Sequence, residues 1–133
     1  ELTYKEMIEN INDIAGVRIV CQLKDDIFKI RNLLEKIPGL IIEKEKDYVT
    51  YPKESGYSSY HLILKVPITL SNQIIYVKIE VQIRTLAMDF WATIEHKVKY
   101  KSEQEINKKV SKELVNYAKI VNKLDNKMML MNN

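Results

Sequence analysis

Cysteine is almost absent from this chain, because Cys21 is the only one among 133 residues. An intrachain disulfide is therefore excluded, and a reducing, cytoplasmic compartment is the simplest expectation. Long hydrophobic runs are absent too, since no apolar run approaches the ~18 residues that span a membrane. Neither charge dominates: a net charge of +3 requires neither DNA nor a membrane as partner and permits RNA without indicating it. It suits anionic small molecules.

The sequence also lacks the glycine-rich fingerprints of common nucleotide-binding folds. It contains neither a P-loop nor a dinucleotide-binding pattern. It has no internal repeat or evident linker, and 133 residues suffice for one domain with a core but not for two. We therefore expect a single domain over 1–133, with its core over about 1–101 and a C-terminal helical segment over about 105–131.

Residue spacing predicts alternating helices and strands. The expected strands cover 14–21, 40–48, 59–66 and 74–84, and the expected helices cover 1–12, about 25–37, 85–101 and about 105–130. Residues 50–58 are rich in turn formers and should form a loop. A short connector with Pro67, Ser71 and Asn72 predicts that the last two strands form an antiparallel hairpin. The order indicates an α/β domain of the α+β type, in which helices flank a small mixed, largely antiparallel sheet.

The two C-terminal helices carry apolar residues at helical spacing. In the helix over 85–101 these are Leu86, Phe90, Ile94 and Val98. We expect Phe90 and Trp91 in the core. In the last helix they are Val110, Leu114, Tyr117, Val121, Leu124, Met128 and Met131. Packing on the domain is expected as far as about Leu114, and the remaining stripe, exposed on a monomer, predicts a homo-oligomer.

The strand over 76–84 is the most informative segment, because its two faces differ. Alternate side chains of a strand point to opposite faces, so one face can enter a core with Val77, Ile79, Val81 and Ile83. The other face carries Lys78, Glu80, Gln82 and Arg84. This mixed-charge face is too polar for a core. It predicts the floor of a polar site, with one carboxylate between cations and an amide.

Two other segments supply groups that fit this floor. Asp13 opens the first expected strand, and together with Glu80 it suits a divalent metal such as Mg²⁺. The loop that runs from Lys46 to His61 contains Lys53, Ser55, Gly56 and Tyr57. Lysine neutralises phosphate charge, glycine permits close backbone approach, and tyrosine offers a flat surface for a base. These residue types predict a magnesium–nucleotide site.

Each of these residues also has a purely structural explanation. Asp13 alone is more often a cap or an exposed acid, and Tyr57 is more often a surface turn residue. His61 would ordinarily be a hydrogen-bonded structural histidine. Glu80 is the hardest to explain in this way, because its polar neighbours need partners or water.

Three segments together resemble the synthetase domain of the RelA/SpoT superfamily. They are Asp13-Ile-Ala-Gly-Val-Arg18, Lys53-Glu-Ser-Gly-Tyr-Ser-Ser-Tyr-His61 and Glu80-Val-Gln-Ile-Arg-Thr-Leu-Ala-Met-Asp-Phe-Trp-Ala-Thr-Ile-Glu-His96. The resemblance covers roughly 1–125 and is greatest to small alarmone synthetases of Gram-positive bacteria. It implies a nucleotidyltransferase-like fold and a GTP diphosphokinase activity: transfer of pyrophosphate from ATP to the 3′-hydroxyl of GDP or GTP, giving AMP and (p)ppGpp. It also implies Mg²⁺ and a homo-oligomer, a tetramer before a dimer.

The resemblance implies roles for individual residues. Asp13 and Glu80 match the acids of the magnesium site, and Glu80 also matches the group proposed to deprotonate the 3′-hydroxyl. Tyr57 matches the residue that stacks on guanine, and Arg18 matches an arginine that packs on adenine. The surroundings of the guanosine nucleotide are matched by Lys46, Lys53, Ser55, His61, Gln82, Ala92, Glu95 and His96.

One departure from the family pattern concerns ATP. The family carries a basic helical segment before the first strand, whereas Lys5 is the only basic residue before Asp13 here. We therefore expect that an upstream ATP-binding segment is missing and that turnover is impaired. Two alternatives stay open: a related pyrophosphotransferase that acts on another acceptor such as tRNA, or a non-catalytic remnant that binds guanine nucleotides.

Overall fold

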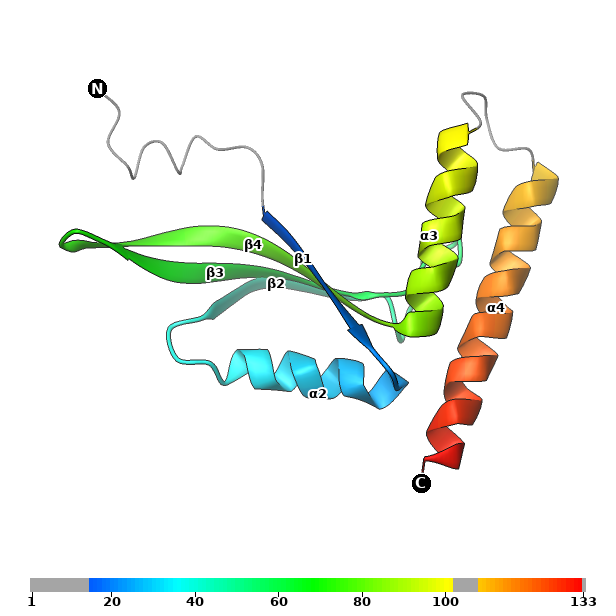
Figure 1. Ribbon diagram of the computed structural model, residues 1–133, viewed down its shortest axis with the longest axis horizontal. Helices are drawn as coiled ribbons and strands as arrows, with labels where there is room; N and C mark the ends of the chain where they lie inside the picture. The colour runs from blue at the N-terminus through cyan, green and yellow to red at the C-terminus, as the bar shows by residue number, and fades with distance from the viewer. Residues whose placement is uncertain (1–14, 102–107, 133) are drawn as a thin grey trace.

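The computed structural model describes residues 15–101 and 108–132 (Figure 1). The strands within these ranges are β1 (Ala15–Cys21), β2 (Ile41–Asp47), β3 (Tyr60–Leu70) and β4 (Gln73–Thr85). The helices are α2 (Lys24–Glu35), α3 (Leu86–Lys101) and α4 (Lys108–Met131). The expected α+β architecture with a long C-terminal helix is confirmed, while the helix expected over 1–12 lies outside the described residues. No helix in the described part of the chain has the length and apolar character needed to cross a membrane.

The four strands form one sheet in the order β1-β4-β3-β2. β4 pairs with β3 and β3 with β2 in antiparallel fashion, whereas β1 runs parallel to β4. This parallel pairing joins segments that lie far apart in the sequence, because α2, β2 and β3 come between them. It sets Gly16 opposite Glu80 and Arg18 opposite Gln82.

The β3–β4 hairpin is longer than the sequence predicted. Leu70 pairs with Gln73, so the turn contains only Ser71 and Asn72, and Ser71 has a positive φ of 52°. Pro67, expected in the connector, lies within β3 opposite Tyr76. A proline fits there because β2 pairs with β3 only up to Lys65, so that side of β3 needs no amide donor at position 67.

The core lies on the sheet face that α2 covers (Figure 1). Ile27 of α2, Leu62 of β3 and Ile83 of β4 are completely buried there. Val81 is buried and Ile79 packs against the same cluster. The apolar face predicted for the strand over 76–84 therefore does enter the core, and the opposite face remains available for polar side chains.

Helix α3 buries a different face from the one the sequence predicted. Met88 and Trp91 are buried, and the Trp91 indole Nε1 donates a hydrogen bond of 2.8 Å to the carbonyl oxygen of Leu114 in α4. Leu86 and Phe90 are each 68% exposed, so the expectation that Phe90 is a core residue is wrong. The face towards α4 is selected by Trp91, whose large ring and N–H both find partners there.

Helix α4 packs on the rest of the domain beyond Leu114, farther than expected. Asp125 is buried near its C-terminal end and accepts a hydrogen bond of 2.8 Å from Thr85 Oγ1 at the end of β4. Burial raises the pKa of the Asp125 carboxyl, while this hydrogen bond and the charge of Lys24 oppose the rise. Val121 also packs against the core. The exposed part of the predicted apolar stripe is Tyr117, Leu124, Met128 and Met131.

Candidate functional site

A row of polar side chains crosses all four strands on the face opposite α2. In strand register, Arg18 of β1 lies opposite Gln82 of β4, Gln82 opposite His61 of β3, and His61 opposite Lys46 of β2. Residues opposite each other on paired strands project from the same face. The sheet therefore brings together residues from four separate segments of the sequence. Glu80 lies in the next row, opposite Gly16 and Ile63.

Tyr57 and Glu80 are connected through hydrogen bonds at the centre of this face. The Tyr57 hydroxyl lies 3.0 Å from His61 Nε2 and 3.3 Å from Gln82 Oε1. The Gln82 amide Nε2 donates a bond of 3.2 Å to Glu80 Oε1. The loop residue Tyr57 is thereby tied to the carboxylate on the strand.

This environment favours the neutral form of His61. Burial is the main cause that lowers its pKa, and Lys53, Arg84 and Lys46 lower it further, while Glu80 opposes them. A neutral imidazole can accept the Tyr57 hydroxyl hydrogen at Nε2. Its proton then sits on Nδ1, which lies 3.9 Å from Glu80 Oε1.

Lys53 and two tyrosines form a cation–aromatic group beside His61. Lys53 Nζ lies 4.9 Å from the ring centroid of Tyr48 and 5.3 Å from that of Tyr57. The Tyr48 ring also meets the His61 ring edge to face, with 5.2 Å between centroids. The sequence placed Tyr48 in the loop from Lys46 to His61 but assigned it no role of its own, and the structure makes it a site residue. The sequence signal for Tyr48 was its position directly after Asp47. Asp47 caps the turn there by accepting hydrogen bonds from the amides of Val49 and Thr50.

Two hollows meet at Glu80. One of about 220 Å³ is lined by Lys44, Glu45, Lys46, Tyr48, Lys53, His61, Ile63 and Glu80. The other, of about 240 Å³, is lined by Gly16, Val17, Arg18, Glu80 and Gln82. Glu80 belongs to both linings. The first hollow contains three lysines from β2 and the loop, and the second contains the single cation Arg18.

Several predicted site residues lie outside both hollows. Ala92, Glu95 and His96 are on α3, where Glu95 pairs with Lys99 at 3.4 Å and the His96 ring stacks on Tyr100. Asp13 lies outside the described residues, so its relation to Glu80 stays a prediction. Within 15–101 and 108–132, no group of three or more acidic, histidine or cysteine side chains is arranged to hold a metal.

Ser55 and Gly56 shape the loop itself. Ser55 Oγ accepts a bond of 3.4 Å from the Tyr57 amide. Gly56 has a φ of +97°, and a Cβ atom on it would lie 2.6 Å from the Ala118 Cβ and 3.2 Å from Trp91. The structure therefore gives Gly56 a packing reason, the close approach of the loop to α3 and α4, and the close approach to a ligand that the sequence suggested stays a prediction.

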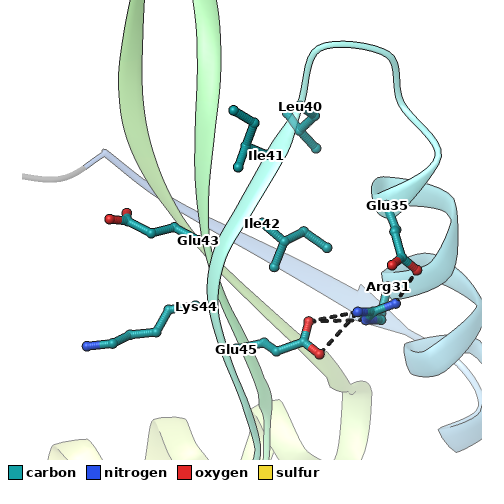
Figure 2. A pocket seen from close by; sticks show the side chains of 8 residues that line it. All are labelled: Arg31, Glu35, Leu40, Ile41, Ile42, Glu43, Lys44 and Glu45. Atoms are coloured by element: carbon teal, nitrogen blue, oxygen red, sulfur yellow. Dashed lines mark hydrogen bonds and ion pairs between the residues drawn. The ribbon is translucent and has the colours of Figure 1, made fainter.

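A third hollow, of about 500 Å³, lies between α2 and β2 (Figure 2). Arg31 lines it from α2, and its guanidinium pairs with Glu45 at 2.9 Å and Glu35 at 2.5 Å (Figure 2). Glu43 and Lys44 complete the charged lining. Because carboxylates outnumber cations and Arg31 is already neutralised, this hollow is unsuited to a phosphorylated ligand. The candidate site is the face that carries Glu80.

Comparison with known proteins agrees with this architecture. Residues 2–105 match the family described as a region found in RelA/SpoT proteins. The chain belongs to the RelA/SpoT family, as its three sequence segments predicted. It is 50% identical over 129 residues to GTP pyrophosphokinase YwaC of Bacillus subtilis (strain 168), covering 97% of this chain and 61% of that protein. The chain therefore spans less than two thirds of the length of this relative.

Solved structures show the same fold. The crystal structure of small alarmone synthetase 2 from Bacillus subtilis aligns with a TM-score of 0.87 at 48% identity, covering 93% of this chain and 67% of that one. Small alarmone synthetase 1 from the same organism, bound to its product pppGpp, aligns with a TM-score of 0.84 at 41% identity, covering 94% of this chain and 64% of that one.

Proposed function

We propose that this chain is a (p)ppGpp synthetase domain, which transfers pyrophosphate from ATP to the 3′-hydroxyl of GDP or GTP and releases AMP. The observation that supports it best is the position of Glu80 between two hollows. A transfer between two nucleotides needs a donor and an acceptor on either side of one reacting centre. A solved relative, small alarmone synthetase 1, carries the product pppGpp.

We assign the acceptor nucleotide to the hollow lined by lysines. Lys44, Lys46 and Lys53 of its lining would neutralise the phosphates. Tyr57 is not part of that lining, but its ring contacts Lys53 and His61, which are, and it would stack on guanine at the edge of the hollow. Lys53 is exposed and lies over the Tyr57 ring, so it is free to move from the ring to the phosphates when the base arrives. The donor ATP is assigned to the hollow that contains Arg18, whose exposed guanidinium suits an adenine face.

The chemistry follows from these positions. The 3′-oxygen of the acceptor attacks the β-phosphorus of ATP, the bond from that phosphorus to the oxygen bridging it to the α-phosphate breaks, and AMP leaves. Glu80 accepts the proton of the 3′-hydroxyl, and Gln82 orients its carboxylate through the 3.2 Å hydrogen bond.

A divalent cation fits the donor set, and we propose Mg²⁺. The Glu80 side chain is 38% exposed and lies opposite Gly16, and Asp13 stands three residues before Gly16 in the sequence. Carboxylate oxygens are the ligands that Mg²⁺ prefers when it also binds substrate phosphates. When bound, the ion would neutralise charge that develops on the transferred pyrophosphate. We also propose a single cytoplasmic domain and a homo-oligomer, a tetramer before a dimer.

The test is a turnover assay with ATP, magnesium and GDP or GTP. It is run on this chain and on a chimera that also carries the residues of Bacillus subtilis YwaC outside the match. We expect (p)ppGpp and AMP in equal amounts, and the chimera tests whether the added residues speed turnover. A chain and chimera that bind neither nucleotide, or form no (p)ppGpp, would refute the proposal.

Glu80→Gln tests the proposed base within the same assay. The amide keeps the size of the side chain but cannot accept the proton, so we expect turnover to fall by about a hundredfold or more. Glu43→Gln is the matched control, because Glu43 of β2 is a carboxylate of the same sheet that pairs with Lys78 at 3.3 Å and Lys65 at 3.8 Å. Near-normal turnover in Glu80→Gln would show that Glu80 is not the base that accepts the 3′-hydroxyl proton.

A further inference from the structure

Arg84 is a buried cation at the edge of the candidate site. It stands two residues after Gln82 on the polar face of β4, and its side chain is only 5% exposed. A guanidinium taken out of water needs hydrogen bonds and a counter-charge. The partners that it has in this structure therefore indicate what it does.

The contacts of Arg84 lie on three different elements. Its Nη2 donates to Gln82 Oε1 on β4 and, over 3.4 Å, to the Tyr57 hydroxyl of the loop. Its guanidinium carbon also lies 5.6 Å from the centroid of the Tyr57 ring. Its counter-charge is Asp89 of α3, at 3.6 Å from Nη1. Two of its three partners are side chains of the candidate site.

Stability alone does not account for this arrangement. Among the described residues, Arg84 Nε and Asp89 Oδ1 are buried without a hydrogen-bond partner. The desolvation cost of an ion pair with one buried partner and unmade hydrogen bonds can exceed the stability that the pair returns. Asp89 is also shared, because Arg18 Nη1 lies 3.3 Å from the same oxygen. Arg18 lines the hollow assigned to ATP.

Arg84 limits which hydrogen bonds the Tyr57 hydroxyl can make. A guanidinium can only donate, so it occupies a lone pair of the hydroxyl oxygen and leaves the proton for His61 or Gln82. At the same time it occupies Gln82 Oε1, which leaves the Gln82 amide free to donate to Glu80. One buried cation thus orients both the aromatic ring and the amide.

We propose that Arg84 is a positioning residue, which holds Tyr57 and Gln82 in the orientation that receives the guanosine nucleotide, with Asp89 as its counter-ion. The inference rests on the proposed function, because it assigns a role within the same site. Arg84 acts through Tyr57, so its removal should matter less once the Tyr57 hydroxyl is absent.

The experiment is a double-mutant cycle measured as the GDP dissociation constant by calorimetry. Arg84→Met keeps the length of the side chain and removes its charge and donors. We expect it to weaken GDP binding about tenfold in the natural background but only about threefold in a Tyr57→Phe background. Arg84→Lys should recover part of the loss, because it restores the positive charge. It should not recover all of it, because an ammonium lacks the planar fork that reaches two partners. Lys29→Met, which removes a cation from an exposed position of α2 outside the hollows, should leave the constant unchanged.

Three results would overturn the inference. One is a folded Arg84→Met chain that binds GDP as the natural chain does. A second is an equal loss in both backgrounds, which indicates a general structural effect. A third is loss of the fold, judged by circular dichroism, in both Arg84→Met and Arg84→Lys. If the natural chain itself does not bind GDP, the proposed function fails together with this inference, and that failure appears before any substitution is made.

Discussion

Tyr57 is the residue on which the guanosine assignment depends most. The exposed side chain of Lys53 lies over the Tyr57 ring, and the Tyr57 hydroxyl lies within hydrogen-bond distance of His61 and Gln82. We predict that Tyr57→Ala weakens GDP or GTP by about tenfold or more in calorimetry, because a stacked base contributes roughly 1–3 kcal/mol. ATP should be affected far less. Tyr51→Ala is the control, since Tyr51 belongs to the same loop and is exposed. Equal losses for both nucleotides would contradict a guanine platform.

His61 makes stability depend on pH. Its pKa is lowered in the folded chain, so the unfolded chain binds more protons between that value and the usual 6.5. Stability should therefore rise with pH through this window, and it should fall as the solution is acidified below 6.5. We predict that His61→Gln flattens this dependence in urea unfolding measured from pH 5 to pH 8. His96→Gln, on the exposed surface of α3, should leave the slope as it is. A His61→Gln chain with an unchanged slope would count against a lowered pKa for the half-buried imidazole.

At the scale of elements, the loop between β2 and β3 depends on its contact with the two C-terminal helices. Gly56 has a positive φ of +97°, and an added Cβ would lie 2.6 Å from the Ala118 Cβ. We predict that Gly56→Ala lowers the free energy of unfolding by about 1–3 kcal/mol in urea, because the backbone strain and the overlap both act on the folded chain. Gly16→Ala is the matched control, since a Cβ there meets nothing within 4 Å and no positive φ is required. Equal effects of the two substitutions would refute the packing explanation.

At the scale of the whole molecule, α4 presents apolar side chains that nothing in the described residues covers. Leu124 is 45% and Met128 44% exposed, and Tyr117 and Met131 are exposed on the same helix. We predict a homo-oligomer that uses this surface, with a mass above one chain in light scattering. Leu124→Glu combined with Met128→Glu should lower that mass, because association would then have to bury two carboxylates at the contact.

Lys127→Glu controls for the change of charge, since it alters an exposed position of α4 without removing an apolar side chain. A monomer for the natural chain at high micromolar concentration would contradict the assembly. The exposed Leu86 and Phe90 of α3 form a second apolar surface, which the sequence did not predict.

The sequence by itself determined the features that arise from local periodicity and chemistry. The alternation over 76–84 separated a core face from a polar face, and the structure has that separation. Turn-forming residues predicted the loop over 50–58, and four-and-three spacing predicted the last helix. The motifs that contain Glu80 and Tyr57 predicted the RelA/SpoT family, which the family comparison confirmed. Each of these depends on residue type and spacing within one segment.

Only the tertiary structure decided which faces of the helices are buried and which distant residues meet. The spacing of α3 favoured Leu86 and Phe90, yet Trp91 selected the buried side because α4 supplies a carbonyl acceptor for its N–H. The parallel pairing of β1 with β4 brought Arg18 beside Gln82, and the loop brought Tyr48 and Tyr57 together, with the Tyr57 ring beside Arg84 of β4. The spacing of apolar residues predicts that a side chain will be buried. It does not predict which segment buries it, because that segment comes from another part of the chain. Contacts between distant segments therefore follow from the fold and not from any one segment.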